Sequence, residues 1–219
     1  MKTALPAQLK PRDRAIITAA ILIWCIWVGL NTQSMLRFDF ESQAKSNPPA
    51  KLPVFKQGVG DAKLPSIFLI LHPRCPCSNV SLEAFSHILE RVKGRVNATI
   101  VFVKPSADLN DEWVQSKLWK SAKEIKTAEL LVDEKGAIAK TFDAQISGQV
   151  LLYDEHGQLR YSGGLNEARG QQPSGVAEER LVSMINKKIA AKDANVSKGL
   201  PALGCPLHDG EKRCSSAVR

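Results

Sequence analysis

The chain has 219 residues, enough for one well-buried core with appendages and hardly enough for two full domains. Its net charge of +8 comes largely from lysines and arginines near the two ends, and those elsewhere have acidic neighbours. This distribution argues against nucleic-acid binding, because a basic isoelectric point without a basic stripe describes only solubility and surfaces.

An uncharged stretch near the N-terminus predicts a membrane anchor. Residues 15–30 hold no charged side chain and residues 31–36 add none, which is long enough to cross the hydrocarbon core. Trp24 and Trp27 suit the headgroup boundary. A cleaved signal peptide is the alternative, but the residues around Leu30 make a poor small-residue cleavage site.

The charge that precedes this stretch sets its predicted orientation. A basic cluster keeps the N-terminus in the cytoplasm: Lys2, Lys10, Arg12 and Arg14. We predict a cytoplasmic basic tail over residues 1–14 and a single-pass transmembrane anchor over residues 15–33, in a bacterial inner membrane. The rest of the chain would then face the periplasm, an oxidising compartment in which disulfides persist.

The exported part is predicted to be a linker, a domain and a tail. Residues 34–63 mix charges with prolines and glycines, as a linker does, and residues 192–219 form a polar, cysteine-containing tail. Periodicity in the domain, residues 64–191, predicts alternating strands and helices and therefore an α/β fold, with a mixed central sheet flanked by helices. The predicted order is strand 67–71, helix 79–92, strand 98–103, helix 111–125, strand 130–132, helix 137–142, hairpin strands 149–153 and 158–161, and helix 176–191.

Cysteines supply the candidate chemistry. Cys75 and Cys77 lie between the first buried strand and the first helix, where the positive end of the helix favours the reactive thiolate. Cys75 is the predicted nucleophile, and Cys77 or Cys205 would resolve it, although a bridge between neighbours two residues apart closes a strained ring. His72, three residues before Cys75, would lower the pKa of that thiol as a base or a positive neighbour.

The same residues suit two other functions. His72, Cys75 and Cys77, with Cys205 or His208 as a fourth ligand, form a donor set that copper(I) or zinc prefers. The protein would then bind or deliver metal, working beside a respiratory oxidase. In the remaining alternative the cysteines only staple a non-catalytic scaffold, through a Cys77–Cys205 bridge or a loop between Cys205 and Cys214.

Four motifs carry a resemblance to a known group. They are His-Pro-Arg-Cys-Pro-Cys-Ser at 72–78, Ser-Gly-Gln-Val-Leu-Leu-Tyr-Asp at 147–154, Ser-Gly-Gly at 162–164 and Gly-Cys-Pro-Leu at 204–207. In this order they resemble the RedB-type branch of bacterial thioredoxin-like proteins, over about residues 15–207. The resemblance implies a membrane-tethered thioredoxin fold that faces the periplasm. Our leading prediction for it is disulfide exchange with periplasmic protein thiols without a cofactor, and copper or zinc belongs to the metal alternative.

Two departures from thioredoxin-like reductases mark the site. The second cysteine of their Cys-x-x-Cys motif is replaced by Ser78, and the position of their cis-proline falls on Gly148. In that family this loop orients the substrate cysteine, so the resemblance makes Ser147 and Gly148 the predicted substrate-binding residues. It also aligns Cys75 with the exposed first cysteine of the family motif.

Overall fold

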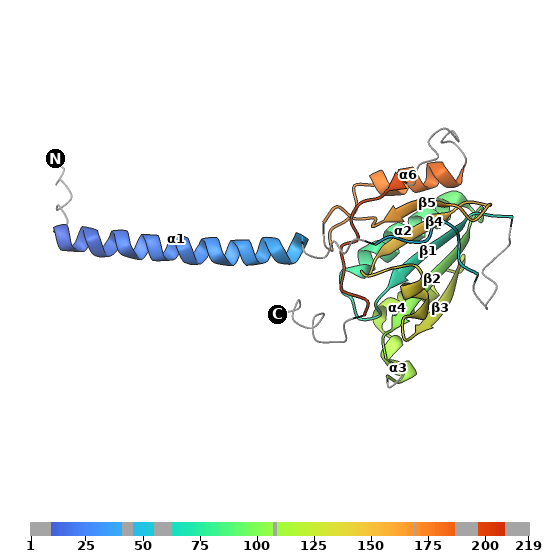
Figure 1. The fold of residues 1–219 in the computed structure, drawn as a ribbon, viewed down its shortest axis with the longest axis horizontal. Coiled ribbons are helices and arrows are strands. Elements are labelled where there is room, and N and C mark those ends of the chain that lie inside the picture. Colours follow the sequence, from blue (N-terminus) through green and yellow to red (C-terminus); the bar gives the residue numbers. More distant parts are fainter. Residues whose placement is uncertain are drawn as a thin grey trace, which may run out of the picture. The chain divides into compact units, whose positions relative to one another are not determined.

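The computed structural model describes residues 10–40, 46–54, 63–106, 109–168, 170–186 and 197–208 (Figure 1). The chain divides after residue 41 into two compact units. The first is built on one long helix, α1 (Pro11–Phe40), and the second contains a mixed sheet with its helices.

Helix α1 is a candidate membrane span. Its segment Pro11–Gln33 is 23 residues long and apolar enough to cross a bilayer. Large apolar side chains such as Ile23 and Trp24 are exposed along it, as a lipid-facing helix requires. The helix continues to Phe40, so the first part of the predicted linker is helical.

The second unit has the sheet of a thioredoxin-like fold, as the sequence predicts. Its strand order is β3-β2-β1-β4-β5-β6, with β1 parallel to β2 and antiparallel to β4, and β2 parallel to β3. The strands are β1 (Ser66–Leu71), β2 (Asn97–Lys104), β3 (Ala128–Glu134), β4 (Gln149–Tyr153), β5 (Leu159–Gly163) and β6 (Ser197–Lys198). The helices are α2 (Ser78–Val92), α3 (Asp111–Val114), α4 (Lys117–Lys123), α5 (Ala137–Thr141) and α6 (Val176–Ile185).

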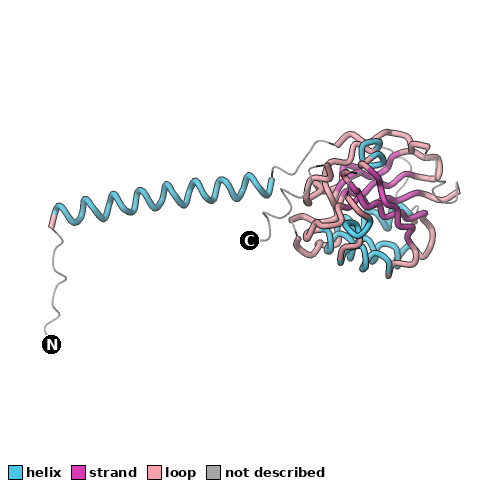
Figure 2. Tube along the Cα trace, turned by 90° about the horizontal axis from the view of Figure 1, so that it is seen from below, coloured by secondary structure: helices cyan, strands magenta, loops and turns pink. Residues whose placement is uncertain are grey.

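Central strand β1 is buried on both faces, which explains its uninterrupted apolar sequence. Ile67, Leu69 and Leu71 belong to the core that also contains side chains of α2, α4 and α6. Phe68 and Ile70 belong to a second core on the other face, with α5 (Figure 2). This double packing fixes where β1 ends, and therefore where the turn with Cys75 and Cys77 begins.

The predicted helix 111–125 is two helices. The chain leaves helical geometry at Gln115 and Ser116, and each helix has its own N-cap, because Asn110 accepts from the Trp113 amide and Ser116 from the Trp119 amide. The apolar spacing was helical throughout, but the two caps interrupt it.

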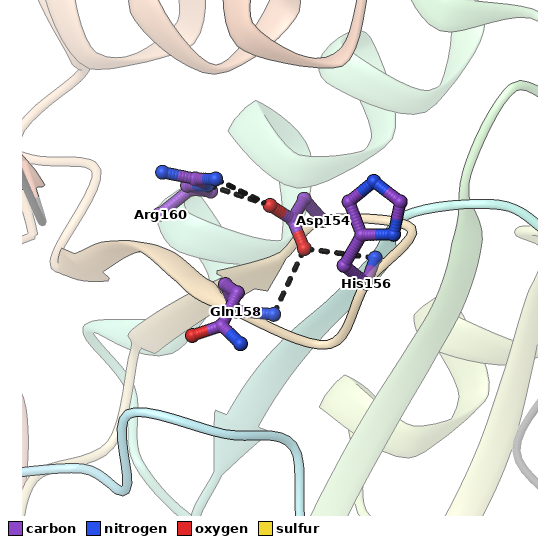
Figure 3. Close-up of polar contacts among 4 residues, drawn as sticks. All are labelled: Asp154, His156, Gln158 and Arg160. Atoms are coloured by element: carbon purple, nitrogen blue, oxygen red, sulfur yellow. Dashed lines mark hydrogen bonds and ion pairs between the residues drawn. The ribbon is translucent and has the colours of Figure 1, made fainter. Parts of the chain in front are cut away.

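The β4–β5 hairpin turns where predicted, around Asp154 (Figure 3). Its carboxylate accepts hydrogen bonds from the amides of His156 and Gln158 at 2.9 and 2.8 Å, and from Arg160 Nε at 2.7 Å. Such an Asx-type network holds a turn without any further role.

Part of the predicted linker packs against the domain. The carbonyl of Ala50 accepts from the amide of Leu159, Lys51 bridges to Gln158, and Pro49 O accepts from the Tyr153 hydroxyl. Residues 46–52 therefore belong to the folded unit, where the sequence predicts only a spacer.

Candidate functional site

The turn between β1 and α2 presents Cys75 and Cys77. The amide of Cys75 donates to the His72 carbonyl at 3.0 Å, and the amide of Ser78 donates to the Cys75 carbonyl at 3.2 Å. Cys77 is the N-cap of α2, and its side chain makes no capping hydrogen bond. Both sulfurs therefore lie at the positive end of a 15-residue helix, as the sequence predicts.

Residues 197–208, which we call the C-terminal strap, bring the third cysteine to this turn. The strap pairs with β5 through β6, bridges Gly164 at Leu200, and bridges Ile146 at Pro206. Leu207 is buried in the core beside α5. Cys205 is thereby placed on Cys75, and its amide donates to the Cys75 sulfur at 3.3 Å. The predicted tail is thus part of the folded unit over these residues.

Glycines allow the C-terminal strap to lie this close. A Cβ at Gly204 would stand 2.1 Å from the Ser147 carbonyl oxygen, and one at Gly199 would stand 2.3 Å from the Tyr161 hydroxyl. Neither gap admits a methyl group without backbone movement. The glycine before Cys205 therefore has a steric explanation, because a side chain at position 204 would collide with Ser147.

Gly204→Ala should open the site. The added methyl must push the C-terminal strap away from Ser147, which weakens the 2.9 Å bond from the Ser147 amide to the Cys205 carbonyl. We expect Cys75 to be alkylated about tenfold faster or more at pH 7, the factor that one lost hydrogen bond supplies. Peptide mass spectrometry measures this rate, with Gly29→Ala as control because a Cβ there meets nothing within 4 Å. An unchanged rate would show that the strap does not limit access.

The Cys75 sulfur interacts with the other two sulfurs of the site. The thiol of Cys205 and then that of Cys77 donate hydrogen bonds to it, and these donors, with the Ser78 hydroxyl, hold the pKa of Cys75 well below its ordinary value although burial acts the other way. We therefore expect this sulfur to be ionised at neutral pH, as the sequence predicts, but the causes of the lowered pKa are the two thiols and Ser78 rather than the predicted helix end and His72. No disulfide joins the three described cysteines of this unit in the structure.

The solvent exposure of the three cysteines differs from the prediction. Cys75 and Cys205 are only 2% and 4% exposed, whereas Cys77 is half-buried and follows the exposed Pro76. The expectation that Cys75 is the exposed cysteine is wrong, because the C-terminal strap covers it. A Cβ at Gly170, where the backbone has positive φ, would lie 3.9 Å from the Cys77 sulfur, so the loop before α6 borders this outer thiol.

The predicted substrate-binding loop lies directly beneath the turn. Ser147 is fully buried, and its hydroxyl accepts from the His72 amide at 2.8 Å and contacts the Ser78 hydroxyl at 2.7 Å. Gly148 has φ +91° and donates to the Ile70 carbonyl. A Cβ on Gly148 would lie 3.0 Å from Ser81 Oγ, so glycine satisfies both backbone and space. Substrate binding by these residues stays a prediction.

The two histidines of the alternative metal set lie in separate surroundings. The buried ring of His72 stands edge-on to Trp113, with centroids 5.3 Å apart, and its Nδ1 accepts from the Arg74 amide. The ring of His208 contacts the Ala144 carbonyl at 3.0 Å and lies against Gly136. Within the described ranges, no group of three or more His, Cys, Asp or Glu side chains is arranged to hold a metal ion. Cys214 lies outside the described residues.

Sequence reasoning missed the role of Ser78. It marked this residue as a lost cysteine, whereas its hydroxyl contacts both Ser147 and the Cys75 sulfur. The position of Ser78 next to Cys75 and Cys77 was the signal in the sequence that could have indicated this role. The pairing with Ser147, 69 residues away, had none.

One solved structure shows the same fold, and others are similar at lower TM-scores. A hypothetical protein from Sinorhizobium meliloti 1021 has a TM-score of 0.55 at 18% identity and covers 77% of this chain and 97% of its own. An uncharacterized conserved protein from Geobacillus kaustophilus gives 0.49 at 18% identity, over 77% and 92%. A thioredoxin-like protein in its oxidized form gives 0.48 at 15% identity, over 67% and 100%.

No family model matches the chain, and no curated protein matches it. Identities this low carry the fold and nothing about activity. The chain is therefore a thioredoxin-fold protein, with one N-terminal helix that qualifies as a membrane anchor.

Proposed function

We propose that this chain is a thiol–disulfide oxidoreductase of the RedB type, anchored in the bacterial inner membrane with its domain in the periplasm. One observation carries the proposal: the Cys75 sulfur lies at the start of α2 in contact with two further thiols, whose hydrogen bonds lower its pKa. A sulfur that two others can reach is able to form either of two disulfides, which a merely structural bridge does not need.

Cys77 is the sulfur that meets the partner protein, because it is the most exposed of the three. Its thiol already donates to the Cys75 thiolate, so its proton can pass to that sulfur as Cys77 attacks. The attack forms a mixed disulfide between Cys77 and one partner sulfur and breaks the partner's disulfide. The other partner sulfur leaves as a thiolate and takes up the proton.

Cys75 and Cys205 complete the transfer inside the protein. The Cys75 thiolate attacks the Cys77 sulfur, and the bound partner leaves as its second thiolate. The resulting ring between Cys75 and Cys77 is small and strained, so the Cys205 sulfur attacks Cys75, breaks the bond to Cys77 and leaves a Cys75–Cys205 disulfide. Cys77 is released as a thiolate, and the proton of Cys205 passes to the partner's second thiolate. The partner gains two electrons and two protons in total, and the protein loses them.

The full-length chain in detergent micelles tests this function. We expect the reduced protein to reduce insulin in the presence of a dithiol regenerant, and peptide mapping after one turnover to find Cys75 joined to Cys205. Metal analysis after anaerobic purification provides the second arm. No turnover, together with stoichiometric copper that is lost in Cys75→Ser, would favour metal delivery, and a reduction potential below about −300 mV would favour a staple.

A further inference from the structure

Two buried hydroxyls lie under the cysteine turn and are not used by the exchange steps. Ser147 and Ser78 are 0% and 1% exposed, and their oxygens are 2.7 Å apart. Burying a hydroxyl costs free energy unless it is hydrogen-bonded, so the contacts of this pair define their orientation.

The neighbours of the pair fix the direction of its hydrogen bonds. The amide of His72 donates to Ser147 Oγ at 2.8 Å, which leaves the Ser147 hydrogen free to point at Ser78 Oγ. The Ser78 hydroxyl in turn hydrogen-bonds the Cys75 sulfur. The chain of donors therefore runs from the His72 amide through Ser147 and Ser78 to Cys75, and each bond polarises the next.

The main chain of Ser147 positions the residues around Cys205. Its amide donates to the Cys205 carbonyl at 2.9 Å, and the preceding residue, Ile146, bridges to Pro206. This pairing sets the place of the Cys205 amide, which donates to the Cys75 sulfur at 3.3 Å. One residue thus supports two separate donors to the same sulfur.

We propose that Ser147 is a positioning residue for Cys75, which aims the Ser78 hydroxyl through its side chain and the Cys205 amide through its main chain. It acts on the Cys75 sulfur through these two groups. The inference rests on the proposed function, because a stabilised Cys75 thiolate matters only to a protein that uses it as base and nucleophile. It also gives the side chain of Ser147 a role distinct from substrate binding.

The experiment measures Cys75 itself, with no partner protein present. Full-length protein in micelles is alkylated with iodoacetamide across a pH series, and the Cys75 peptide is quantified by mass spectrometry. In Ser147→Ala we expect the midpoint of the alkylation profile about one to two pH units higher, because the Ser78 hydroxyl is no longer held in the orientation that donates to the charged Cys75 sulfur. Ser147→Thr keeps the hydroxyl and should restore the midpoint. Ser86→Ala, an exposed α2 hydroxyl that donates to the Glu83 carbonyl, should leave it unchanged.

A lower melting temperature with an unchanged midpoint in Ser147→Ala would overturn the proposal and leave a purely structural residue. Should Ser147→Ala fail to fold, Ser78→Ala breaks the same chain one link nearer the sulfur, and an unmoved midpoint there overturns the proposal equally. The readout needs no turnover. A raised midpoint in a protein that reduces no disulfide would therefore refute the proposed function and leave this assignment standing.

Discussion

Cys75→Ser should lose disulfide reduction by about a thousandfold or more and accumulate a mixed disulfide on Cys77. The two cysteines differ in exposure, since Cys77 is partly exposed to solvent and Cys75 is covered by the C-terminal strap. Cys77 therefore forms the mixed disulfide with the partner, and Cys75 then attacks it. Without Cys75 the captured partner loses the thiolate that displaces it, so the adduct on Cys77 persists. Insulin turnover measures the loss, and non-reducing electrophoresis with peptide mapping identifies the adduct.

The other cysteines give matched comparisons. Cys77→Ser should form no adduct, and Cys205→Ser should stop with Cys75 joined to Cys77. Cys25→Ser removes a free cysteine of helix α1 and should behave as the parent chain. If Cys77→Ser keeps its turnover, Cys75 meets the partner directly and the order of steps proposed above is wrong.

The fold was predictable because its signals are local. Strands β1 and β2 are covered on both faces and read as apolar runs, and the helix after Cys77 repeats its apolar residues at helical spacing. The hairpin was also predictable, because Asp154 and Gly157 are residue types that favour turns. The boundary inside 111–125 was wrong, because two capping side chains interrupt a continuous apolar pattern, and parts of the predicted linker and tail belong to the folded unit.

The sequence predicted only part of the candidate site. Helix geometry and the motif placed Cys75 and Cys77 together, and the low pKa of Cys75 was expected from the helix end. Its burial was not, because it depends on residues 130 positions later in the chain. A polar, glycine-rich segment looks like a tail in the sequence, and only the missing side chains at Gly199 and Gly204 reveal that it packs against the sheet edge. The contact between Ser78 and Ser147 had no local signature at all.

The stability of the reduced domain should rise steeply with pH. Cys75 is a thiolate in the folded state, since the Cys205 and Cys77 thiols lower its pKa, whereas the unfolded chain binds a proton there up to its ordinary pKa of about 8.5. The unfolded state then holds one more proton between the two pKa values, so the stabilisation is complete above about pH 8.5 and is lost as pH falls toward the folded value. For one proton the expected slope is about 1.4 kcal/mol per pH unit.

Urea unfolding of the full chain under reductant, between about pH 5 and pH 8, measures this slope. The fluorescence of Trp113, which is buried, and Trp119, which packs against Phe102, reports on the domain. Cys75→Ala retains every other titrating group, so the difference between the two slopes belongs to this one sulfur. Parallel slopes would mean that Cys75 keeps its proton in the folded protein, and a protonated Cys75 could neither accept the proton of Cys77 nor displace its partner.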